Sequence, residues 1–138
     1  MELKLQVGVK IFLKNKDGKY LLVKRSPEKY KNVKGDWDIV GGRIETGSTL
    51  IENLKREIKE ETGLELKSEP VLLCAQDIFY GGEKHVVRLS YKGETDGEPV
   101  LDTNENIDYR WLSFDELKNQ ENLDFYVKEI LDKGIIDN

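Results

Sequence analysis

Hydrophobic and polar residues alternate along the first part of the chain, with apolar side chains at nearly every second position from Leu3 to Leu13. A period of two is typical of a β-strand that has one apolar face. Residues 16–19 contain Gly18 and are predicted to form a hairpin turn, because glycine tolerates the positive φ that such turns need. Shorter segments predict further strands at residues 20–24, 37–40, 71–79, 85–91, 99–101 and 109–112.

The clearest helix is predicted over residues 49–62, where the apolar positions recur with a helical period. Ser48 or Thr49 can cap its start, and Thr49 and Glu52 have the spacing of a capping box. Gly63 follows the last turn, where a left-handed residue commonly ends a helix. Local signals therefore define both ends of this helix.

The end of the chain contains a second capping box, Ser113 with Glu116, and a last helix is predicted over residues 123–132. Strands on both sides of a central helix, with another helix at the end, indicate an α/β (α+β) fold in which a mixed sheet lies between helices. The 138 residues show no repeat and no linker, so we expect a single domain over residues 1–138.

Composition and charge narrow the range of possible functions and partners. The net charge is −5 and no block of Lys and Arg occurs, which argues against a nucleic-acid polymer as partner but allows a small polyphosphate that brings metal ions with it. The single cysteine, Cys74, permits no intrachain disulfide and is expected to be a buried thiol. No apolar stretch has the length of a membrane span or of a signal peptide, so we expect a cytoplasmic protein without a membrane partner.

The predicted helix carries an unusual group of carboxylates, Glu57, Glu60 and Glu61, in one sector of its surface. Like charges at this spacing repel each other, and they lie near the helix C-terminus, where the dipole already disfavours negative charge. Mg²⁺ prefers oxygen ligands and is commonly shared between carboxylates and phosphates. The group, preceded by Gly41 and Gly42, therefore suggests a metal platform, while a solvated acidic helix after a glycine-rich turn is the alternative.

The run from Gly42 to Leu64 closely resembles the Nudix box, which is a glycine, five residues, a glutamate, seven residues and then Arg-Glu-apolar-x-Glu-Glu-x-Gly-apolar. The matching residues are Gly42, Arg56, Glu57, Ile58, Glu60, Glu61, Gly63 and Leu64. Ser48 stands where the pattern has its first glutamate, so it supplies no charge to orient Arg56 or to support the metal shell. Val40 replaces the usual proline before the two glycines. The resemblance implies a Nudix-like α/β/α sandwich.

The resemblance also implies a metal site and a reaction. Glu57 and Glu61, assisted by Glu60 and by the Gly41 carbonyl, would hold Mg²⁺ or Mn²⁺, and Arg56 would position Glu57. The reaction would be hydrolysis of a nucleoside diphosphate linked to another group by a metal-activated water. The candidates for the base that takes the proton of the water are Glu57, Glu60 and Glu105.

Three further residues resemble site residues of the mutator-type nucleoside triphosphate pyrophosphohydrolases. Glu105 would be an additional metal ligand, with a solvated loop carboxylate as the alternative. Arg25 would contact phosphates, with an exposed arginine at a strand end as the alternative. Asn122 would recognise the base, while Gly42 from the box would lie against the substrate. His85, Trp37, Phe79 and Tyr80 are expected to have structural roles in the core or in turns.

The sequence thus predicts an enzyme that acts on a small free nucleotide, with a nucleoside triphosphate as the leading substrate. Dinucleoside polyphosphates, ADP-ribose and nucleotide sugars are the alternative substrates. A catalytically weakened nucleotide-binding module is the alternative from another class, and it depends on Ser48. The sequence carries no signal for the oligomeric state of the protein.

Overall fold

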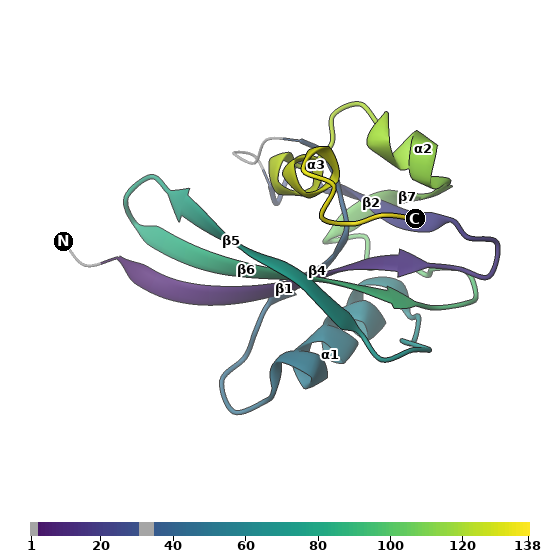
Figure 1. Ribbon diagram of the computed structural model, residues 1–138. Coiled ribbons are helices and arrows are strands. Elements are labelled where there is room, and N and C mark those ends of the chain that lie inside the picture. The colour runs from purple at the N-terminus through teal and green to yellow at the C-terminus, as the bar shows by residue number, and fades with distance from the viewer. Residues whose placement is uncertain (1–2, 31–34) are drawn as a thin grey trace.

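The computed structural model describes residues 3–30 and 35–138, and it shows a twisted mixed sheet with helices on both faces (Figure 1). The strands are β1 (Lys4–Lys14), β2 (Tyr20–Arg25), β3 (Trp37–Asp38), β4 (Val40–Arg43), β5 (Val71–Tyr80), β6 (Lys84–Glu94) and β7 (Asn106–Leu112). The helices are α1 (Leu50–Thr62), α2 (Phe114–Lys118) and α3 (Phe125–Asp132). Helix α1 covers one face, and α2 and α3 cover the other, so the predicted layering is confirmed.

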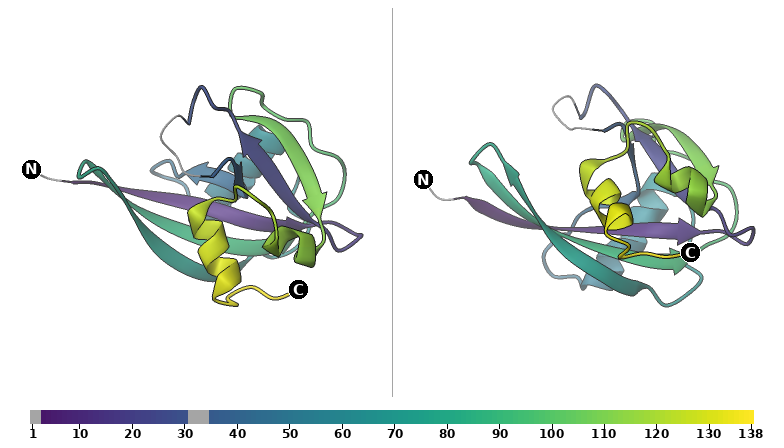
Figure 2. Two further views of the ribbon diagram at one scale, coloured as in Figure 1. Left: turned by 90° about the horizontal axis from the view of Figure 1, so that it is seen from above. Right: turned by 45° about the horizontal axis from the view of Figure 1, so that its top comes forward.

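Pairing within the seven-stranded sheet is both parallel and antiparallel. Strand β1 runs parallel to β6 over its whole length, from Lys4 beside Lys84 to Lys14 beside Glu94. It pairs antiparallel with β4, and with β2 only where Lys14 meets Tyr20. Strand β5 is antiparallel to β6, and β7 is antiparallel to β2. The β5–β6 hairpin and the start of β1 extend beyond the helices (Figure 2).

Two separate groups of buried apolar residues stabilise the sheet, one on each face. The group under α1 contains Val9, Ile11, Leu13, Leu21, Val23, Val40, Leu54 and Ile58. The group under α2 and α3 contains Phe12, Tyr20, Leu22, Trp37, Ile39, Leu117, Val127 and Ile130. Strand β1 contributes to both groups. Helices cover both faces of the sheet at this strand, so side chains on both of its sides are buried.

The local signals for the helices are confirmed. Thr49 and Glu52 form a complete capping box at the start of α1, and Gly63 ends the helix with a φ of 68°. Ser113 and Glu116 form the second box, at the start of α2. Helix α3 begins later than predicted, because the side chain of Asp124 caps it.

The predicted strand at residues 99–101 is wrong. This segment is irregular, and its Val100 N–H donates to the carbonyl oxygen of Thr62 at 2.8 Å, at the end of α1. The backbone donor is thus used by the helix terminus and not by a sheet ladder. Within the described part of the chain, no helix has both the length and the hydropathy that a bilayer crossing requires.

Candidate active site

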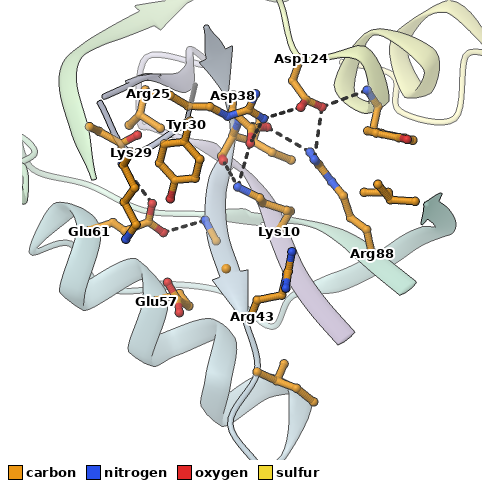
Figure 3. Close-up of a pocket in the computed structure, with 18 of the residues that line it drawn as sticks. Lys10, Arg25, Lys29, Tyr30, Asp38, Arg43, Glu57, Glu61, Arg88 and Asp124 are labelled. Carbon is orange, nitrogen blue, oxygen red and sulfur yellow. Dashed lines mark hydrogen bonds and ion pairs between the residues drawn. The ribbon is translucent and has the colours of Figure 1, made fainter. Parts of the chain in front are cut away.

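A cavity of about 930 Å³ opens between α1 and the start of α3 (Figure 3). Helix α1 contributes Glu57 and Glu61, and the adjoining strand β4 contributes Gly41 and Gly42. Basic side chains from β1, β2 and β6, the residues that begin α3 and the end of β5 form other parts of the wall. The volume lies in the range of small-molecule sites in proteins.

Glu61 is the most deeply buried carboxylate of α1, with 6% of the residue exposed. It accepts a hydrogen bond from the Gly41 N–H at 2.9 Å and another from Asn106 Nδ2 at 3.0 Å. Burial raises the pKa of the Glu61 carboxyl to about 8, and the nearby Glu57 adds to that effect. Burial therefore favours the protonated form of Glu61, and a bound cation would favour the carboxylate instead.

Glu57 lies one helical turn before Glu61 and lines the same cavity. Burial also raises the pKa of its carboxyl, with Glu60 contributing and Arg56 opposing the change. A Cβ atom at Gly42 would stand 2.8 Å from the Glu57 carboxylate, so glycine is needed for this close approach. A Cβ atom at Gly41 would stand 2.0 Å from the carbonyl oxygen of Val9.

Arg56 connects two of the three helix carboxylates. Its Nη1 lies 3.1 Å from an oxygen of Glu57 and 3.1 Å from an oxygen of Glu60. The Glu60 side chain is 56% exposed and does not line the cavity, whereas that of Glu57 is 14% exposed. The predicted sector of three carboxylates is therefore divided, with Glu57 and Glu61 facing the cavity and Glu60 facing Arg56 and solvent.

The wall opposite α1 contains a buried ion cluster, which we define as Lys10, Arg25, Asp38, Arg88 and Asp124. The carboxylate of Asp38 forms ion pairs with Lys10 Nζ at 2.8 Å, Arg25 Nη2 at 2.6 Å and Arg88 Nη2 at 3.0 Å. Asp124 pairs with Arg25, and with Arg88 at 3.2 Å. Three cations and two carboxylates leave this wall with one net positive charge.

The cluster determines the ionisation of Asp38. Burial opposes its charge, but Lys10, Arg88 and Arg25 outweigh burial and hold the pKa of this carboxyl well below its usual range. Arg25 is 8% exposed and lines the cavity, so the alternative interpretation, an exposed arginine at a strand end, is wrong. Its contact with phosphate stays a prediction.

Glu105 lies near the cavity rim, beside residues that line it. It accepts hydrogen bonds from Lys29 Nζ and the Tyr30 hydroxyl. These two contacts outweigh partial burial and lower the pKa of the Glu105 carboxyl, while burial and Glu105 raise the pKa of the Tyr30 phenol. Glu105 is therefore no free loop carboxylate, and its use as a metal ligand stays a prediction.

The structure does not bring Asn122 into the cavity. This residue has a positive φ of 57°, and its side-chain amide donates to Asp36 at 2.6 Å. Asp124, Phe125 and Tyr126 line the cavity instead.

The remaining aromatic and sulfur-bearing candidates are divided between core and surface. Trp37 is buried in the core, as predicted. Phe79 and Tyr80 are 63% and 39% exposed and line the cavity, so neither has the core role, while both directly precede the turn at Gly81, the other role expected of them. His85 stacks on Phe79 and contacts Asp77 at 2.8 Å, in a structural role. Cys74 is half-buried.

Within residues 3–30 and 35–138, no three His, Cys, Asp or Glu side chains converge closely enough to hold a metal ion as they stand. Glu57 and Glu61 nevertheless suit a divalent cation by their chemistry. They are neighbouring oxygen donors on one wall of the cavity, and burial raises the pKa of both, so each lacks full compensation for its charge. Two carboxylates in this state are stabilised when a cation replaces the protons.

Sequence reasoning missed the buried ion cluster, apart from Arg25. Lys10, Asp38 and Arg88 occupy strand positions that a simple alternation assigns to solvent. Asp124 carried a usable signal, because an aspartate just before an apolar run is a strong helix N-cap.

Comparisons with known proteins agree with this geometry. The fold superposes on the MutT protein from Methanosarcina mazei Go1 with a TM-score of 0.78 and 26% sequence identity, covering 96% of this chain and 94% of that one. An ADP-ribose pyrophosphatase from Methanocaldococcus jannaschii is 46% identical over 57 residues, which are 41% of this chain and 32% of the relative.

The 8-oxo-dGDP phosphatase NUDT18 of Homo sapiens is 38% identical over 66 residues, which are 48% of this chain and 19% of the relative. The chain thus spans less than a third of the length of either of these two sequence relatives. The NUDIX domain family matches residues 4–133, nearly the whole chain. The protein belongs to the Nudix family.

Proposed function

We propose that this protein is a divalent-metal-dependent hydrolase that cleaves a phosphoanhydride bond in a nucleoside diphosphate linked to another group. One observation carries the proposal: Glu57 and Glu61 face a nucleotide-sized cavity whose opposite wall holds the net positive ion cluster. This separation places a site for cations opposite a surface that attracts anions, and a polyphosphate needs both.

The carboxylates of Glu57 and Glu61 would hold Mg²⁺ or Mn²⁺, with the Gly41 carbonyl and Glu105 as the further ligands. Glu60, the third carboxylate expected in this set, does not line the cavity and is left out of it. When bound, the metal neutralises charge on the phosphates and makes a water molecule more acidic. Glu57 is better placed than Glu60 to take the proton of the attacking water, because Glu57 lines the cavity. Arg56 holds Glu57 in place, and Arg25 and Gly42 lie where phosphates would pass.

For the substrate, we propose a nucleoside triphosphate that is cleaved to the monophosphate and pyrophosphate. Arg25 lines the cavity and Glu105 lies near its rim, in support of the resemblance to the triphosphate pyrophosphohydrolases. ADP-ribose is the second candidate, because the relative with 46% identity over 57 residues is an ADP-ribose pyrophosphatase. Cytoplasmic location and a small-nucleotide partner belong to the same proposal.

The test is release of phosphate and pyrophosphate from a nucleotide panel with Mg²⁺ or Mn²⁺. The panel contains ordinary dNTPs, 8-oxo-dGTP, 8-oxo-dGDP, ADP-ribose, nucleotide sugars and dinucleoside polyphosphates. Wild type is compared with Glu61→Gln and with the control Glu65→Gln, an exposed carboxylate beyond the end of α1. We expect metal-dependent turnover that Glu61→Gln lowers by orders of magnitude and that Glu65→Gln leaves unchanged.

Two outcomes would contradict the proposal. Equal turnover by wild type and Glu61→Gln would remove Glu61 from the metal site. Nucleotide binding without turnover on any member of the panel would indicate a binding module, for which a ligand-dependent rise in Tm is the expected signature.

A further inference from the structure

Asn53 is a polar residue near the start of α1, its fourth residue, and has no exposed surface. Amide side chains are uncommon in such positions unless every polar atom has a partner. Its Nδ2 donates to the carbonyl oxygen of Thr49 at 2.8 Å and to that of Ser48 at 3.2 Å. Its Oδ1 accepts from the Glu45 N–H at 2.8 Å and from Arg56 Nη2 at 3.0 Å.

The two ends of the Asn53 amide thus do different things. The nitrogen ties the loop before α1 to the first turn of the helix. The oxygen accepts from Arg56 Nη2, whereas Glu60 contacts Nη1, and the same oxygen accepts from the Glu45 N–H of the loop. Both contacts are short, and a buried amide has few alternative rotamers, so the position of the oxygen is well defined.

The contacts of Arg56 show why this matters. Its Nη1 lies against the carboxylates of Glu57 and Glu60, whereas its Nη2 donates only to neutral acceptors, Asn53 Oδ1 and the Arg43 carbonyl at 3.3 Å. The Asn53 oxygen fixes the plane of the guanidinium through Nη2, while Nη1 contacts Glu57 and Glu60 and lies 3.6 Å from the carboxylate of Glu45.

We propose that Asn53 takes over the task of the glutamate that the Nudix box has at position 48, and that it is the positioning residue for Arg56 and, through Arg56, for Glu57. Ser48 has no carboxylate. Its carbonyl oxygen accepts from the nitrogen of the Asn53 amide, and the oxygen of the same amide accepts from the Arg56 guanidinium, so the Asn53 side chain connects position 48 to Arg56. The proposal rests on the proposed hydrolase function, and it predicts that the departure at Ser48 does not make the site inactive.

A purely structural role for Asn53 would use the contacts of its nitrogen and the contact of its oxygen with the Glu45 N–H, all at the helix start. The two roles separate because only the positioning role needs an acceptor for Arg56. Asn53→Ala removes both, Asn53→Asp keeps an acceptor toward Arg56 but loses the donor toward Thr49 and Ser48, and the double variant Asn53→Ala with Ser48→Glu restores a carboxylate near Arg56 without restoring the donor.

The first measurement is independent of turnover. In ¹⁵N-labelled protein, the guanidinium signals of Arg56, assigned with Arg56→Lys, report whether its N–H groups are held. We expect slow hydrogen exchange in wild type, faster exchange in Asn53→Ala and slow exchange again in the double variant. If Arg56 exchanges equally in wild type and Asn53→Ala, the positioning role is refuted, whatever the protein hydrolyses.

The second measurement is turnover with the substrate found in the panel above. Asn53→Ala is expected to lower kcat or the apparent Mg²⁺ affinity by about 10- to 100-fold, the usual effect of losing a residue that orients a metal ligand, with little change in KM for the nucleotide. Ser48→Glu in the Asn53→Ala background is expected to recover about ten-fold of that loss, which is a coupling that independent sites do not show. Asn53→Asp is expected to keep kcat while lowering Tm.

The matched control is Thr49→Ala, which removes the N-cap hydroxyl of α1 but leaves the contacts of Arg56 intact. We expect it to lower Tm without changing kcat. Equal loss of kcat in Thr49→Ala and Asn53→Ala, or no recovery by Ser48→Glu, would assign Asn53 a structural role only. Absence of wild-type turnover would count against the proposed function, and the exchange measurement would still decide the role of Asn53.

Discussion

The Glu61 carboxyl allows a prediction of how stability depends on pH. Its pKa is about 8 in the folded protein, against an ordinary value of 4.5. Between these values the folded chain binds this proton more tightly than the unfolded chain does, so the folded state loses stability as pH rises. At about 1.36 kcal/mol per pKa unit, raising the pH from 5 to 8 lowers the free energy of unfolding by about 3 kcal/mol through this group alone.

Glu61→Gln is neutral at every pH and cannot contribute this dependence. The amide also loses one acceptor toward Gly41 or Asn106, but that loss does not change with pH. We therefore expect the difference in unfolding free energy between wild type and Glu61→Gln to change by about 3 kcal/mol between pH 5 and pH 8, with the variant gaining relative to wild type as pH rises.

The assay is urea unfolding in EDTA at a series of pH values. Glu60→Gln is the matched control, because this side chain on the same helix is 56% exposed, and its difference from wild type is expected to stay within about 0.5 kcal/mol. Parallel pH profiles for wild type and Glu61→Gln would refute the reasoning. Mg²⁺ should stabilise wild type more at pH 8 than at pH 5, since it replaces a bound proton.

Three further changes test other parts of the site. Asp38→Asn removes a buried carboxylate that contacts three cations, so we expect the free energy of unfolding in urea at pH 7 to fall by about 3–5 kcal/mol. Because the pKa of Asp38 is held low, this advantage of wild type shrinks as pH falls through the folded-state pKa. Gly42→Ala places a methyl group against the Glu57 carboxylate and should lower kcat more than ten-fold, with a stability change under about 1 kcal/mol in the same unfolding assay. Lys29→Met frees Glu105 from an exposed ion pair and should improve apparent Mg²⁺ affinity, measured in metal titrations of turnover, by about 0.2–1 kcal/mol.

Each of these expectations has a clear contrary result. An Asp38→Asn protein as stable as wild type would mean that the remaining members of the ion cluster rearrange without cost. Normal kcat in Gly42→Ala would mean that Glu57 can move without consequence for the chemistry. Weaker Mg²⁺ affinity in Lys29→Met would mean that Lys29 positions Glu105 and does not compete for it.

Much of the fold was predictable because its signals are local. The alternation in β1, the two capping boxes and Gly63 each depend on residues a few positions apart, and each is found in the structure. The pairing of β1 with β6 was not predictable, because nothing in either segment specifies a partner in a distant part of the chain. The strand predicted at residues 99–101 failed because a helix end uses its backbone donor.

The candidate site shows the same division. The acidic wall follows from one helix and one glycine pair, so a contiguous motif could predict it. The basic wall is assembled from several strands, and a charged residue within a strand is indistinguishable in sequence from a solvent-facing one. Lys10 and Asp38 become partners only through the sheet. Asn53 was missed for a related reason, since an amide in the first turn of a helix gives no sign in the sequence that it is buried.

The parallel pairing of β1 with β6 has a consequence for how the molecule reaches its native state. Every residue of β1 finds its partner 80 positions later, as Lys4 does with Lys84. Closing a loop of this length must precede the contacts that reward it, and topologies dominated by such contacts fold slowly. During synthesis, the apolar side chains of β1 emerge long before β6 exists to cover them. Arg88, on β6, cannot meet Asp38 until that loop has closed, whereas Lys10 reaches Asp38 through the pairing of β1 with β4. The anion-attracting wall would therefore be completed late in folding, after the local signals of α1 could already have formed its helix.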